Sequence, residues 1–146
     1  MERNSVKSAN PPTKKEVDYD PAEHRVKHCW QEPRADFIKS GTAFIGKCPS
    51  TLSKVCAREL LNNAEFEGRE PNQVVADVMP ERVWNVHEGI VYEAVPSGPG
   101  AYHGYPWRGR PGRNRLPRGV KRVLQQKAEQ QGYEREFQDW LDQYES

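Results

Sequence analysis

A two-residue turn between two apolar segments is the feature that most restricts how this chain can fold. The segments on either side of Glu88-Gly89 are rich in β-branched and aromatic side chains. Glycine at the second position of such a connection is typical of a tight β-hairpin. The sequence therefore predicts a hairpin over residues 83–95, in which His87 lies opposite Ile90.

The predicted register divides the hairpin side chains between two faces. One face carries polar side chains, namely Asn85, His87 and Tyr92. The other face carries Trp84, Val86 and Val91. Because the second face is the more apolar, we expect it to pack against a helix at 50–63.

Three segments have the apolar spacing of amphipathic helices. The first spans 50–63, is capped by Ser50 or Thr51, and presents Leu52, Val55, Cys56 and Leu60 on one face. The second follows Pro117 and ends at Gly132. The third carries an aromatic stripe of Tyr133, Phe137, Trp140, Leu141 and Tyr144. A short strand fits the run at 42–45, whereas 74–78 fits either a helix or a strand.

These elements predict one α+β domain over residues 37–146. Its small antiparallel sheet is centred on the hairpin at 83–95 and is packed by the helix at 50–63 and by two C-terminal helices. Residues 1–36 are polar and lack a sustained period, which predicts a disordered or loosely attached arm. Only 35% of the residues are hydrophobic, so we expect a small core for a chain of 146 residues.

The sequence predicts a cytoplasmic protein that does not cross a membrane. No apolar stretch approaches the roughly 20 residues that span a bilayer, and the N-terminus lacks the apolar region of a secretory signal. An odd number of cysteines, Cys29, Cys48 and Cys56, argues against a disulfide framework. Their role stays open.

We expect no metal and no cofactor. The cysteines do not have the spacing of structural zinc sites. Residues 41–47 match the first seven positions of a P-loop, but Cys48 stands where a Ser or Thr should bind magnesium, and Pro49 lacks an N–H.

Charge is strongly segregated in the second half of the chain. Residues 94–128 contain no Asp or Glu, whereas residues 129–146 are mainly acidic. Six arginines of the basic segment are candidates for binding the phosphates of RNA or another polyanion: Arg108, Arg110, Arg113, Arg115, Arg118 and Arg122. The alternative is that these arginines pair with the acidic C-terminal segment.

Two histidines and a tyrosine lie close to this basic segment in the sequence. His87 and His103 are candidates for the acid and base that cleave a phosphodiester without metal, and Tyr102 for stacking on a base. This predicts an RNA-binding protein and a possible ribonuclease. A surface role for His87 and a covering role for the turn at 102–106 are the alternatives.

A protein-interaction module is the rival function. In that hypothesis the acidic C-terminal helix docks on an adaptor, inhibitor or immunity-type partner through Phe137, Trp140 and Tyr144.

The motif Tyr102-His103-Gly104-Tyr105-Pro106 follows an apolar strand and precedes a basic helix. In this layout, residues 83–125 resemble the C-terminal effector domains of bacterial polymorphic toxins. The resemblance implies a toxin-like nuclease.

Overall fold

A four-stranded sheet forms the centre of the computed structural model, which describes residues 16–19, 31–40, 43–109 and 114–145. The strand order is β1-β6-β5-β4. Its strands are β1 (Asp18–Tyr19), β4 (Val83–His87), β5 (Ile90–Gly98) and β6 (Ala101–Pro106). β1 runs parallel to β6, and the other neighbours are antiparallel.

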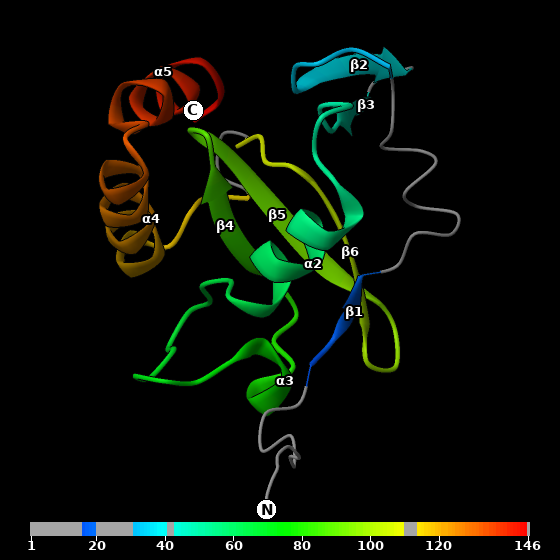
Figure 1. Cartoon of the computed structure of the whole chain (residues 1–146), viewed down its shortest axis with the longest axis vertical. Coiled ribbons are helices and arrows are strands. Elements are labelled where there is room, and N and C mark those ends of the chain that lie inside the picture. The colour runs from blue at the N-terminus through cyan, green and yellow to red at the C-terminus, as the bar shows by residue number, and fades with distance from the viewer. Residues whose placement is uncertain (1–15, 20–30, 41–42, 110–113, 146) are drawn as a thin grey trace, which may run out of the picture.

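A two-stranded antiparallel ribbon and four helices surround this sheet (Figure 1). The ribbon consists of β2 (Asp36–Ser40) and β3 (Ala43–Lys47). The helices are α2 (Lys54–Asn62), α3 (Val75–Val78), α4 (Arg118–Gln131) and α5 (Glu134–Tyr144). The chain therefore has the predicted α+β fold.

The hairpin forms in the predicted register. His87 lies opposite Ile90 and Asn85 opposite Tyr92. Glu88 and Gly89 both have positive φ angles, +53° and +81°, as a two-residue hairpin turn that matches the strand twist requires. The local chemistry of the turn thus sets the geometry of the sheet.

The prediction of which hairpin face packs on α2 was wrong. Ala57 and Leu61 of α2 lie in one apolar cluster with Val83 and Tyr92, on the face that carries Asn85. The face of Trp84, Val86 and Val91 packs instead against α4 and α5. These two helices together supply more apolar area than α2, and their stripe includes large aromatic rings, so burying them on the more apolar face removes more surface from water.

The start and buried face of α2 also differ from the prediction. Ser53, rather than Ser50 or Thr51, caps the helix, and its Oγ accepts a hydrogen bond from the Cys56 N–H at 3.0 Å. Val55 is 71% exposed. The fully buried positions of the helix are Ala57 and Leu61.

The prolines and glycines at 96–100 are typical of a loop, but β5 continues through Gly98 with an irregularity between Pro96 and Gly98. The chain then reverses through Gly100, whose φ is +71°. The motif at 102–106 consequently lies within β6 rather than at the end of a loop.

Part of the predicted N-terminal arm belongs to the sheet. Val17 is 1% exposed, and its N–H donates to Asn62 Oδ1 at 2.8 Å. Residues 18–19 then pair with β6. The description of 1–36 as a loose arm is therefore wrong for residues 16–19. Residues 1–15 and 20–30 lie outside the described part of the chain.

The two C-terminal helices form as predicted, and Gly132 ends α4 with a φ of +83°. Figure 1 shows α4 and α5 together at one side of the sheet. Residues 107–117 connect β6 to α4 and carry four of the six candidate arginines.

Candidate nucleic-acid interface

Residues 107–117, which we call the basic connection, are anchored by the buried Trp107. The Trp107 side chain is fully buried, and its Nε1 donates to the Asn114 carbonyl at 2.9 Å. The Trp107 carbonyl accepts from Trp140 Nε1 of α5 at 3.1 Å. These bonds join Trp107 to Asn114 and to α5, and so fix the connection to the core.

Asn114 joins the basic connection to the sheet. Its φ of +55° is a conformation that asparagine tolerates better than most residues. Its Oδ1 accepts from Arg82 at 2.6 Å, and its Nδ2 donates to the Arg108 carbonyl at 2.9 Å. The guanidinium of Arg82 lies 3.6 Å from the carboxylate of Glu93 on β5. A chain of polar contacts therefore runs from the sheet to Arg108.

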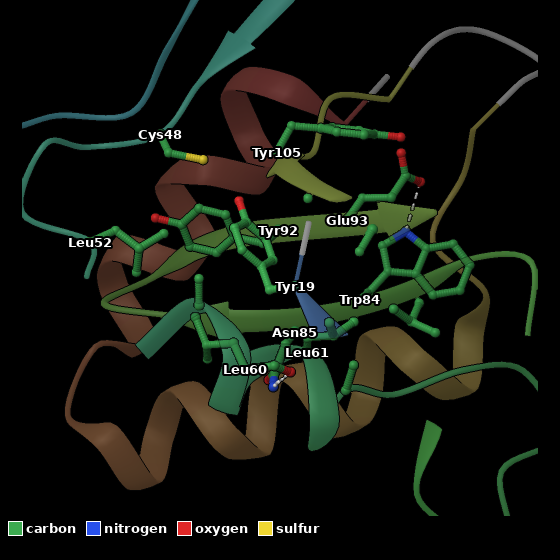
Figure 2. Close-up of a pocket in the computed structure, with 15 residues that line it drawn as sticks. Tyr19, Cys48, Leu52, Leu60, Leu61, Trp84, Asn85, Tyr92, Glu93 and Tyr105 are labelled. Carbon is green, nitrogen blue, oxygen red and sulfur yellow. Dashed lines mark hydrogen bonds between the residues drawn. The ribbon is translucent and has the colours of Figure 1, made fainter. Parts of the chain in front are cut away.

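Glu93 is a buried carboxylate, only 2% exposed. Burial raises its pKa, while Arg82 and hydrogen bonds from Tyr105 and Trp84 act in the opposite direction. Trp84 Nε1 donates at 3.1 Å, and Figure 2 shows the Tyr105 hydroxyl directed at the carboxylate. Burial and the neighbouring Glu93 in turn raise the pKa of Tyr105. Because donors surround Glu93 inside the protein, we interpret it as an anchor for the basic connection.

Three arginines at the start of α4 are exposed and make no ion pair with the described residues. We call them the arginine face: Arg115, Arg118 and Arg122. Positions 118 and 122 are one helical turn apart and point away from the buried residues Val120 and Leu124.

The other predicted arginines have different surroundings. The Arg108 guanidinium lies 5.4 Å from the centroid of the Phe37 ring and 5.7 Å from that of Tyr144, so it stacks on aromatic rings. Arg110 and Arg113 lie outside the described residues.

The acidic C-terminal helix does not neutralise the arginine face. Two lysines of α4 make the ion pairs instead: Lys121 with Glu145 and Lys127 with Glu65, both at 2.9 Å. In the described part of the chain, positive charge at the beginning of α4 therefore faces solvent.

A cleft of about 390 Å³ adjoins the arginine face. It lies between the first turn of α4, including Arg118, and the loop at 65–69. Arg69 also lines this cleft, although it is bound to Glu65 at 3.3 Å.

The structure does not bring the predicted catalytic residues together. His87 lies on the sheet face of Asn85, whereas His103 is paired with Val95 and lies on the opposite face. From the rise along a strand and the spacing between strands, the two positions are about 15–20 Å apart. The prediction that His87 and His103 form an acid–base pair was therefore wrong, because neither could reach a phosphodiester that the other contacts.

The proposed stacking role of Tyr102 was also wrong. Its side chain is 0% exposed, and its hydroxyl donates to the Pro80 carbonyl. Alternation along β6 places this ring inside the core, where no base can stack on it.

The predicted docking stripe of the C-terminal helix is largely buried. Phe137 and Trp140 lie in the core cluster beneath α4 and α5, and Tyr144 is half-buried against Phe37. The prediction of a docking stripe was wrong for Phe137 and Trp140, because the domain itself covers them, whereas a partner contact at Tyr144 stays a prediction.

The cavity in Figure 2 lies between α2 and the sheet and has a volume of about 40 Å³. Its walls are mostly apolar. The Tyr92 hydroxyl is buried and finds no hydrogen-bond partner among the described residues. Burial raises the pKa of Tyr92 well above its ordinary value. This space is far smaller than a typical ligand pocket of roughly 300–1,000 Å³, so we interpret it as a packing feature.

The chain matches no protein-family model, no curated protein and no solved structure. Within the described ranges, no helix is long and apolar enough to cross a membrane. No group of three or more His, Cys, Asp or Glu side chains in the same ranges could hold a metal ion.

The residues that hold the basic connection in place were not predicted from the sequence. Glu93 could have been found from the sequence, because it interrupts the apolar run of β5 and the predicted register places it opposite Trp84. No comparable signal indicated Arg82 or Asn114, whose contact spans 32 residues.

Proposed function

We propose that the protein binds RNA through the arginine face. The observation that carries this proposal is the exposure of Arg115, Arg118 and Arg122 without a carboxylate partner among the described residues. Guanidinium groups form bidentate hydrogen bonds with phosphates, so two of them one helix turn apart, with Arg115 just before the helix, fit a polyanionic backbone.

The aromatic surroundings of Arg108 favour single-stranded RNA over a duplex. Phe37 and Tyr144 are half-buried, and both rings lie within 6 Å of the guanidinium. Unpaired bases stack on aromatic rings and on arginine planes, whereas bases in a duplex do not offer their faces. The Gly109 N–H also donates to the Tyr144 carbonyl at 2.9 Å, which ties the basic connection to these rings.

The test is fluorescence anisotropy with a labelled single-stranded RNA at several salt concentrations. The variant replaces all three arginines of the arginine face by Ala. Wild-type affinity should fall steeply between about 50 and 200 mM salt. The slope of log K against log salt should become shallower by about 2 in the variant, because each lost phosphate contact on a single strand removes roughly 0.7.

A charge-matched control replaces three exposed basic residues elsewhere by Ala, namely Lys39, Lys54 and Arg135. This control should bind RNA with nearly the wild-type salt slope. Equal losses in both triple variants would show that net charge alone drives binding, and an unchanged slope in the arginine variant would overturn the proposal. Equal competition by heparin and by RNA would contradict the preference for unpaired bases.

A further inference from the structure

A second cleft lies at the other end of α4, about 18 Å along the helix from Arg118. Its volume is about 410 Å³, and it forms where α2, the end of β4 and the end of α4 meet. Amide side chains dominate its walls: Asn63, Asn85, Gln130 and Gln131. Cys56 and His87 line the same cleft.

Cys56 and His87 are in direct contact. The Cys56 Sγ lies 3.7 Å from His87 Nε2, although the two residues are 31 positions apart in the chain. Both side chains are half-buried, so the pair is reachable from the cleft. Cys48, by contrast, is buried in the core.

Rigid elements hold both members of this pair. Cys56 lies in the first turn of α2, where its N–H is bound to the Ser53 cap. His87 ends β4 in register with Ile90, next to the tight turn. That turn packs so closely on α5 that a Cβ at Gly89 would overlap Glu136. A nucleophile and base positioned by separate rigid elements is the arrangement that covalent catalysis requires.

We propose that Cys56 and His87 form a catalytic pair that attacks a carboxamide, with Cys56 as nucleophile and His87 as general base. The wall of the cleft favours this substrate class. Asn63, Asn85 and Gln131 each donate a side-chain hydrogen bond to a backbone carbonyl, whereas the Gln130 amide makes none with the described residues and can pair with a substrate amide. Leu60 is the one apolar lining residue in the described chain, which disfavours a long acyl chain. This proposal is independent of RNA binding.

His87 transfers protons in both halves of the reaction. As the Cys56 sulfur bonds to the substrate carbonyl carbon, the thiol proton passes to His87. The imidazolium then donates that proton to the leaving nitrogen while the carbon–nitrogen bond breaks, which leaves a thioester. In the second half of the reaction, His87 takes a proton from water as the water oxygen bonds to the thioester carbon. The carbon–sulfur bond then breaks to release the acid, and His87 donates this proton to the Cys56 thiolate.

The charged neighbours explain why a base is needed. Burial raises the pKa of the Cys56 thiol, and Glu59 on α2 and Glu88 in the turn raise it further. Lys127 on α4 also lines the cleft, but its ammonium is bound to Glu65, to the Asn63 carbonyl and to Asn85 Oδ1. The resting thiol is therefore neutral, and its attack depends on proton transfer to His87.

The first test measures acylation of the full chain by p-nitrophenyl acetate at pH 7, followed by peptide mapping. We expect one acetyl group on Cys56 in the wild type and none there in Cys56→Ala. His87→Gln should slow acylation by about a hundredfold at pH 7, and less at alkaline pH where the thiol ionises without help. A structural role of His87 would lower the rate equally at all pH values, and that result would overturn the proposal.

Val55→Ala is the matched control, because Val55 lies on the exposed side of the same helix. It should acylate like the wild type, and thermal melts should show that all variants are folded. The second test measures ammonia release from benzyloxycarbonyl-glutaminylglycine. Release that is lost in Cys56→Ala supports the carboxamide assignment, whereas no release from the wild type overturns it.

Discussion

Replacing Phe137 by Ala tests whether the aromatic stripe of α5 is part of the core. The Phe137 side chain is 0% exposed and lies in the cluster formed with Trp84 and α4. Removing a fully buried phenyl ring costs about 3–5 kcal/mol, through lost transfer free energy and the cavity left behind. That is a large part of the roughly 5–15 kcal/mol that stabilises a typical domain.

Urea and thermal unfolding followed by circular dichroism would measure this loss. We expect Tm to fall by roughly 10 °C or more in Phe137→Ala. The control is Gln138→Ala, at the adjacent exposed position, which should change the free energy of unfolding by less than about 0.5 kcal/mol. An unchanged Tm in Phe137→Ala would refute the burial of the stripe and restore it as a partner surface.

Three further changes probe other parts of the fold. Tyr92→Phe should leave the free energy of unfolding unchanged or raise it by about 1 kcal/mol, because it removes a buried hydroxyl without a described partner. Urea unfolding measures this free energy, and a loss above about 1 kcal/mol would contradict the prediction. The raised pKa of Glu93 means that the folded state binds its proton more tightly than the unfolded state, so ionisation costs stability as the pH rises. Wild type should therefore lose stability relative to Glu93→Gln as the pH rises above about 4.5, and melts that stay parallel would refute this. Gly89→Ala should destabilise the protein by at least about 1 kcal/mol, since it combines a positive φ with a clash against Glu136; an unchanged unfolding midpoint would show that the turn and α5 separate easily.

The local elements could be predicted because their chemistry is local. Glu88-Gly89 determines a hairpin turn, and the apolar period of α4 ends at a glycine that adopts a positive φ. The packing partners of the hairpin could not be predicted in the same way. Since both Val83 and Trp84 are buried, alternation along the strand no longer distinguishes an inner from an outer face.

The candidate site could be predicted as a segment but not as a surface. The absence of acidic residues from 94–128 can be read directly from the sequence, and it indicates the basic segment. Whether the arginines pair with α5 depends on where α5 packs, and the structure assigns its ion pair to Lys121. The separation of His87 from His103 depends on the strand at 101–106, which could not be predicted because the prolines and glycines at 96–100 are typical of a loop.

Arginine footprinting tests the RNA-binding proposal most directly. Phenylglyoxal modifies accessible guanidinium groups, and mass spectrometry then compares each site with and without single-stranded RNA. Arg115, Arg118 and Arg122 should be protected by RNA, whereas the exposed Arg135 on α5 should react equally in both samples. Protection of Arg135 with continued modification of the arginine face would contradict the proposed interface.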